Sequence, residues 1–195
     1  MPNNEVLRAI RNRRSTRAFL PDQISDEALD AILEAAIWAP SGSNSQSWLF
    51  TAIQSKAVLD RLNEEMRQGF LLRYVPDDDY PGKHGAKKSA EREDFCFYNH
   101  APTLIIASNR PNYENAMADC ALALENMFLA AESLGLGSCY INSPHWLRDD
   151  PGVRAYLAEL GIPREHTICS SAAFGFIAKE SQTPPRKEGT IKIIR

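Results

Sequence analysis

Basic side chains are concentrated in one short segment near the start of the chain. Residues 11–17 read RNRRSTR and contain four arginines: Arg11, Arg13, Arg14 and Arg17. A guanidinium carries a fixed positive charge and can donate two parallel hydrogen bonds to a carboxylate or a phosphate. On this pattern three interpretations remain open: a solvated helix end, a nuclear-localisation-like patch, or a site for one small anion.

A second segment gathers hydroxyl and amide side chains. Residues 39–48 read APSGSNSQSW, in which the hydrogen-bonding side chains are Ser41, Ser43, Asn44, Ser45, Gln46 and Ser47. An ordinary connection does not need so many such groups. Serine, asparagine and glycine are also common turn formers, so a plain turn and a ligand-binding loop both remain open.

Several other kinds of site are not indicated. Residues 135–140, GLGSCY, begin like a dinucleotide fingerprint, but these glycines follow a helical pattern and enter a strand pattern, which reverses the required order. The sequence contains neither a P-loop nor a GxSxG elbow. The cysteines (Cys96, Cys120, Cys139 and Cys169) form no CxxC motif and the histidines no HExxH motif. We therefore expect no metal site, and reduced, mostly buried thiols.

Composition limits the classes of protein further. The chain has 195 residues, 44% of them hydrophobic, and a formal net charge of −3. This length and apolar content predict one domain over residues 1–195. The charge argues against a general nucleic-acid binder, which needs a broad basic footprint. No apolar run approaches the roughly 18 residues of a membrane span, and the N-terminus lacks the apolar stretch of a signal peptide, so we expect a cytoplasmic protein without a membrane partner.

The hydrophobic pattern predicts alternating helices and strands. Helices are expected around residues 6–10, 26–36, 56–66, 115–135 and 151–160, and strands over 47–53, 101–108, 138–141 and 167–178. Residues 73–94 are polar and turn-rich, which indicates a long loop or lid, with Phe70, Tyr74 and Tyr80 as candidate stacking groups at its rim. Residues 180–195 form a C-terminal arm that ends in the β-like segment TIKIIR. The expected class is α+β or mixed α/β.

The order of these motifs resembles the nitroreductase family of FMN-dependent oxidoreductases. The segments RRSTRAF, APSGSNSQSW, HAPTLIIAS, LGLGSCYI and PPRK follow the family's order and spacing from about residue 6 to residue 187. The resemblance implies an α+β fold with a central, mainly antiparallel sheet flanked by helices, and a homodimer with C-terminal strand exchange. It also implies FMN at each of two subunit-interface sites, reduced by NADH or NADPH and reoxidised by a nitroaromatic, quinone or related small acceptor in a ping-pong cycle.

The resemblance also implies which residues hold the flavin. An FMN phosphate carries a charge of about −1.5 to −2, which calls for cations. Arg13 and Arg186 are expected at the phosphate, Arg14 and Ser15 along the ribityl chain, and Arg17 near flavin N1 and the C2 carbonyl. The remaining candidates are a polar loop and a segment against flavin N5, namely Pro40, Ser41, Gly42, Ser43, Asn44 and Gln46, and Tyr140, Ile141, Asn142 and Ser143. No side-chain acid or base is expected to act in the hydride transfer.

Three readings of function remain open after the resemblance. An FMN-dependent NAD(P)H oxidoreductase is the first; flavin destruction or reductive dehalogenation on the same fold is the second. A non-enzymatic protein that stores or senses FMN is the third.

Asn142 stands where many members of the family carry an acidic residue, so the charge near N5 and the flavin potential are expected to differ.

Overall fold

The centre of the molecule is a four-stranded sheet. A computed structural model describes residues 4–195. The strands are β1 (Trp48–Ile53), β2 (Thr103–Asn109), β3 (Gly137–Ile141) and β4 (Thr167–Gly175), in the order β1-β2-β4-β3. Every neighbouring pair is antiparallel. The two inner strands, β2 and β4, are rich in isoleucine and alanine and almost entirely buried, because helices cover both faces of the sheet.

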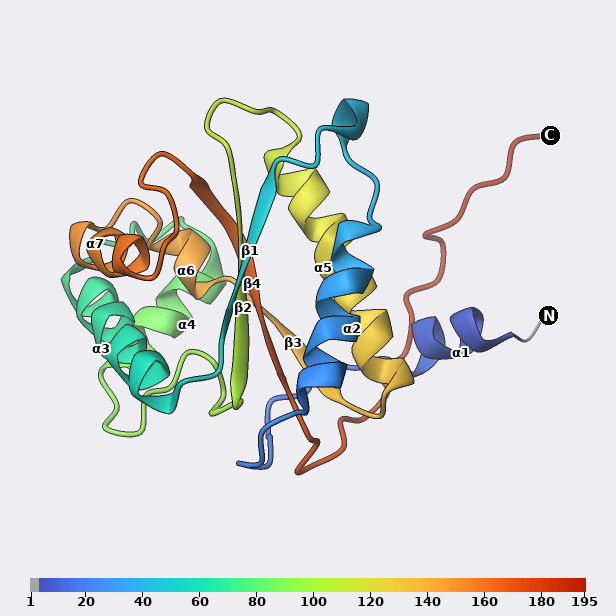
Figure 1. Cartoon of the computed structure of the whole chain (residues 1–195), viewed down its shortest axis with the longest axis horizontal. Helices are drawn as coiled ribbons and strands as arrows, with labels where there is room; N and C mark the ends of the chain where they lie inside the picture. The colour runs from blue at the N-terminus through green and yellow to red at the C-terminus, as the bar shows by residue number, and fades with distance from the viewer. Residues whose placement is uncertain (1–3) are drawn as a thin grey trace.

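One face of the sheet is covered by α2 (Asp26–Ile37) and α5 (Ala116–Ser133), as Figure 1 shows. The predicted N-cap of α2 is confirmed: the Ser25 hydroxyl accepts a hydrogen bond from the amide of Ala28. The apolar core on this side joins Ile32 of α2 and Met127 of α5 to Phe174 of the sheet. Helix α5 is apolar on several sides because it lies between the sheet and α2.

The other face carries α3 (Lys56–Leu72), α4 (Pro81–Ala90), α6 (Ser143–Trp146) and α7 (Pro151–Glu159). Leu62 and Met66 of α3 pack with Leu157 of α7 over the strands. The expectation of a loop over residues 73–94 is wrong for its central ten residues, which form α4. Phe70 is also no rim residue, because it is 1% exposed and packs edge-on against Phe95 in the core.

The two ends of the chain lie beyond α5, away from the sheet. Helix α1 (Glu5–Asn12) contains no buried residue, and the arm after β4 runs outward past α1 (Figure 1). Residues 190–195 form no strand within a single chain, and Ile191 and Ile194 are more than four-fifths exposed. The predicted α+β class with an antiparallel sheet between helices is confirmed. Strand exchange between two chains stays a prediction.

Candidate active site

The arginine segment runs extended beside the outer strand β3. Ser15 pairs with Ser138 in an isolated parallel bridge, and the amide of Thr16 donates to the Ser138 carbonyl over 2.8 Å. A Cβ on Gly137 would lie 2.7 Å from the Thr16 hydroxyl, so the close approach requires glycine there. Side chains alternate along an extended backbone. Arg14 and Thr16 therefore lie on one side of the segment, and Arg13, Ser15 and Arg17 on the other.

Arg13 and Arg17 act on the same thiol of β3. Burial raises the pKa of Cys139, and the positive charges of Arg17 and Arg13 oppose that rise. The Arg13 guanidinium also lies 3.8 Å from a carboxylate oxygen of Glu125 on α5. The structure thus brings two of the predicted flavin-binding arginines to the outer edge of β3.

A cavity of about 410 Å³, here called the β3 cavity, opens next to Arg17. Helix α4 borders it with the small residues Gly82, Gly85, Ala86 and Ser89, which recur with a helical period. The other lining residues come from the segment before β2, from β3 and from α6: Phe95, Cys96, Phe97, Asn99, Cys139, Tyr140, Ile141, Asn142, Ser143 and Trp146. Five predicted site residues, Arg17 and Tyr140 to Ser143, are therefore brought together.

Tyr140 contributes its backbone to this cavity, while its ring lies elsewhere. Cys139 and Ile141 belong to the core on the α3 side of the sheet, and alternation turns the side chain between them to the α5 side. There the tyrosine is 37% exposed, and partial burial of its hydroxyl raises the pKa of that group. The Ser138 carbonyl faces the outer edge of β3, where it accepts from Thr16, so by alternation the backbone groups of Tyr140 face the same edge and are available to a ligand.

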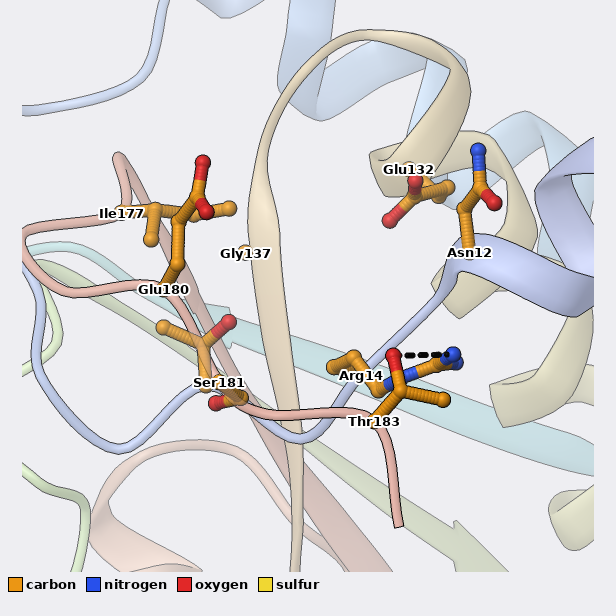
Figure 2. Close-up of a pocket in the computed structure, with 9 residues that line it drawn as sticks. Asn12, Arg14, Glu132, Gly137, Ile177, Glu180, Ser181 and Thr183 are labelled. Atoms are coloured by element: carbon orange, nitrogen blue, oxygen red, sulfur yellow. Dashed lines mark hydrogen bonds between the residues drawn. The ribbon is translucent and has the colours of Figure 1, made fainter. Parts of the chain in front are cut away.

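Arg14 points into a second cavity, shown in Figure 2. Its Nε and Nη2 atoms donate to the hydroxyl of Thr183, over 3.1 and 2.9 Å, and Nη1 donates to the Arg13 carbonyl. Nearby, the Ser181 hydroxyl donates to the Ser15 carbonyl over 3.0 Å. This cavity of about 340 Å³ also exposes the carboxylates of Glu132 and Glu180. The first residues of the arm are thus tied to the arginine segment.

The polar loop of residues 39–48 has an unusual, well-supported backbone. It contains the short helix η1 (Gly42–Asn44), and Ser43, Asn44 and Gln46 have positive φ angles of 53°, 52° and 46°. Positive φ is costly outside glycine, so neighbouring groups must stabilise it. Within the loop, the amide of Gln46 donates to the Ser41 hydroxyl, and the Gln46 side chain donates to Asn44 Oδ1.

Two residues that the sequence did not single out hold this loop from outside. Asp119, on α5 and 3% exposed, accepts from the amide of Gly42 with both carboxylate oxygens at 3.2 Å. The Tyr113 hydroxyl lies 2.8 Å from the same carboxylate and 3.1 Å from the Gly42 carbonyl, and accepts from Ser45. A Cβ on Gly42 would lie 2.6 Å from that hydroxyl, so glycine is required here.

One chain does not bring all the predicted residues together. The polar loop precedes β1, and the β3 cavity lies beside β3, at opposite edges of the sheet. Three strand spacings, about 14 Å in all, separate those edges. Pro40 and its loop, residues 41–46, therefore lie apart from Arg17 and Asn142. Arg186 lies in the exposed part of the arm.

Comparison with known proteins places this geometry in a family. The model of the nitroreductase family matches residues 10–176, which include the arginine segment, the polar loop and every strand. The chain belongs to the nitroreductase family.

Several relatives support the same assignment. A nitroreductase from Bacteroides fragilis, solved with bound FMN, is 42% identical, with a TM-score of 0.91 over 99% of this chain and all of that one. A nitroreductase from Desulfitobacterium hafniense, also solved with FMN, is 26% identical, with a TM-score of 0.86 over the whole of both chains. A Bacillus subtilis protein named FMN reductase is 27% identical over 191 residues, 94% of this chain and 70% of that protein.

Residues 4–195 show neither a metal site nor a membrane span. No group of histidine, cysteine and acidic side chains in this range is arranged to hold a metal ion. No helix in this range is long and apolar enough to cross a membrane. All four cysteines are free thiols, and Cys120, Cys139 and Cys169 are buried, as predicted.

Proposed function

We propose that this nitroreductase is an FMN-dependent oxidoreductase that uses NADH or NADPH to reduce a small acceptor, with one flavin in each β3 cavity of a homodimer. The observation that carries the proposal is the β3 cavity itself. A fixed cation, Arg17, borders it, no acidic side chain lines it, and one wall is the outer edge of β3 beyond Ser138, where its pairing with the arginine segment ends. Arginine and unpaired backbone N–H groups are the donors that an anionic flavin ring needs.

The donor set also fits FMN in size and charge. A cavity of about 410 Å³ lies within the range of small-molecule sites. Arg13 lies on the same side of its segment as Arg17 and would reach the phosphate, with Arg186 supplied by an arm. The ring edge would lie along Tyr140, Ile141 and Asn142, where backbone groups and the Asn142 amide can donate or accept.

The protein positions and polarises the reactants, and bound FMN supplies the hydride chemistry at its N5 atom. Arg17 would stabilise the negative charge of the reduced flavin bound in the cavity that it borders. The small residues of α4 leave room for a planar molecule in the β3 cavity. Because NADH or NADPH and the acceptor use the same cavity, they occupy it in turn, which gives ping-pong kinetics.

A second copy of the chain completes the site. Exposed apolar side chains line the surface formed by α1, α2 and α5, among them Ile10, Ile37, Trp38, Met117 and Leu122. Trp38 is 78% exposed, which is costly for so large an apolar group in water. A homodimer through this surface covers these residues and carries the polar loop of one chain to the β3 cavity of the other. The arm then adds TIKIIR to a sheet edge of the partner.

Flavin identification and single-turnover reduction test the proposal. The purified protein should release FMN rather than FAD, and anaerobic NADH or NADPH should reduce the bound flavin, which a quinone or nitroaromatic then reoxidises. Bound FMN that neither nicotinamide reduces would indicate storage or sensing and overturn the enzymatic proposal. Flavin absorbance that fails to return on reoxidation, with fragments found by mass spectrometry, would indicate flavin destruction instead.

A further inference from the structure

Two thiols that the proposed function does not use meet inside the protein. Cys120 on α5 and Cys169 on β4 are both 0% exposed and belong to one small cluster, with Ala107 and Ala116. Both are free thiols, and the Cys169 thiol donates to the Thr167 carbonyl over 3.6 Å. Such a pair is chemically different from a single buried cysteine, because each sulfur has a partner with which it can form a bond.

An irregularity in β4 creates the pair. The register with β2 matches Ala107 to Ser170 and Ser108 to Ile168, so Cys169 is an extra residue in a β-bulge. Ala172 and Phe174 face α5. Regular alternation from these positions would place Cys169 on the opposite face, away from α5. The bulge turns its side chain to the α5 face, where Cys120 lies.

The two thiols differ in acidity. Interaction with the Cys169 side chain raises the pKa of Cys120, and burial raises it further. The same interaction lowers the pKa of Cys169, and the positive charge of Arg148 acts in the same direction. The thiolate is the reactive form of cysteine. Cys169 is therefore the nucleophile of the pair and Cys120 the proton-holding partner.

The pair also contacts the groups that hold the polar loop. The side-chain amide of Asn109 donates to the Cys120 sulfur over 3.9 Å, and its Oδ1 accepts from the Ser47 hydroxyl over 2.8 Å. Asp119, the neighbour of Cys120 in α5, binds the amide of Gly42. A bond formed at Cys120 therefore acts on two supports of the loop at once.

We propose that Cys120 and Cys169 form a redox-active dithiol, which a hydroperoxide oxidises reversibly to a disulfide. The Cys169 thiolate attacks the terminal peroxide oxygen, the O–O bond breaks, and the sulfenic acid of Cys169 forms as water or an alcohol leaves. The Cys120 thiol then attacks the Cys169 sulfur and a second water leaves. Two thiols lose two electrons and two protons, and the peroxide is reduced. This chemistry does not depend on the proposed flavin reaction.

Oxidation with hydrogen peroxide followed by mass spectrometry under non-reducing conditions tests the proposal. The protein should lose two titratable thiols and two hydrogens, and digestion should yield one peptide pair linked through Cys120 and Cys169. Dithiothreitol should restore both thiols. Cys120→Ser and Cys169→Ser should each abolish the linked pair, whereas Cys96→Ser should retain it. Cys96 is the matched control, because it is the more exposed thiol and lies outside the cluster.

One result would overturn the dithiol proposal, and a second would overturn its link to the polar loop. In the first, Cys120 and Cys169 remain open to alkylation after denaturation although peroxide has oxidised Cys96 in the same sample. In the second, the disulfide forms but amide hydrogen exchange of residues 41–47 is the same in the oxidised and reduced proteins, which would contradict the link to the polar loop. The expected result is faster exchange in the oxidised protein. Both readouts use the unaltered chain, so a variant that fails to fold does not affect them.

Discussion

The polar loop and the C-terminal arm are two irregular segments that satisfy their hydrogen-bonding groups in different ways. The loop, residues 39–48, bonds to Asp119, Tyr113 and its own side chains within one chain. The arm, residues 180–195, is anchored near its start through Ser181 and Thr183, and its last residues lie exposed. The loop is therefore preformed, whereas the end of the arm needs a second molecule to supply its backbone partners.

The polar loop and the arm would contribute to the proposed flavin site in different ways. A preformed loop adds little ordering cost when a ligand binds, because its backbone is already fixed. Under the proposed function the completed site exists only in the dimer, so an arm that orders on dimerisation would link ligand binding to protein concentration. Changes in the arm should therefore act through assembly, and changes at the loop through local stability.

The largest effect is expected from truncation after Gly189. Removing residues 190–195 deletes Ile191, Ile193 and Ile194, which carry the strand-forming pattern of the arm. Dimer and FMN affinity should weaken together, because the flavin site is interfacial under the proposed function. Sedimentation at nanomolar concentration and fluorescence titration of FMN measure the two quantities. A truncated protein that stays dimeric and keeps its flavin would show that the arm has no role in assembly.

Asp119→Asn should give the next largest effect, on the stability of the preformed loop. The amide keeps the shape of the carboxylate but loses the charge that accepts from Gly42 and the Tyr113 hydroxyl. Hydrogen bonds to charged groups contribute about 1.5–3 kcal/mol, so the free energy of unfolding should fall by about 2 kcal/mol. Urea denaturation measures the change. Tyr113→Phe is the matched comparison: it removes one donor to this carboxylate but keeps the Gly42 amide, so it should cost about 1.5 kcal/mol, the low end of the same range.

The oligomeric state of Asp119→Asn tests whether the loop is supported within one chain or by the dimer interface. Asp119→Asn should leave the oligomeric state unchanged at micromolar concentration, because the loop is supported within the chain. Dissociation of this variant with an unchanged loop, seen by hydrogen exchange, would mean that Asp119 supports the interface rather than the loop.

The strands and most helices could be predicted because their apolar side chains repeat with a clear period. Helix α4 could not, since the side it turns to the cavity consists of Gly82, Gly85, Ala86 and Ser89 and gives no apolar signal. Glycine also lowers helix propensity by about 1 kcal/mol relative to alanine. Pro81 at its first turn was the one local indication of a helix start.

The site was predictable where it lies within one segment and unpredictable where distant residues meet. Arg13 and Arg17, which are close in the sequence, both lie near Cys139 of β3, but the sequence did not show that Arg14 lies on the opposite side, because that depends on the extended backbone. Asp119 is 77 residues from the Gly42 amide it binds, and no motif connects the two. Only the packing of α5 beside the loop brings them together.

Arg13→Ala and Arg186→Ala test whether a residue of the arginine segment and a residue of the arm both bind the FMN phosphate. Under the proposed function each would remove a charge-assisted contact with the phosphate worth about 1.5–3 kcal/mol, so FMN should bind roughly tenfold more weakly or worse. In Arg13→Ala the loss of FMN affinity should be independent of protein concentration. In Arg186→Ala the loss of FMN affinity should be accompanied by weaker dimerisation, and so should depend on protein concentration. Isothermal titration with FMN at two protein concentrations distinguishes the two. Wild-type affinity in both variants would remove these residues from the phosphate site.

The smallest effect is expected from Thr183→Val, which preserves the shape of the side chain and removes the hydroxyl that accepts from Arg14. The contact is exposed, so its loss should cost at most about 1 kcal/mol. The effect should fall on the start of the arm, where hydrogen exchange of residues 181–183 should rise while that of residues 41–47 stays unchanged. Ser181→Ala, which removes the bond to the Ser15 carbonyl, should act in the same way. Faster exchange in the polar loop would show that loop and arm are coupled within one chain, and would contradict the separation drawn between them.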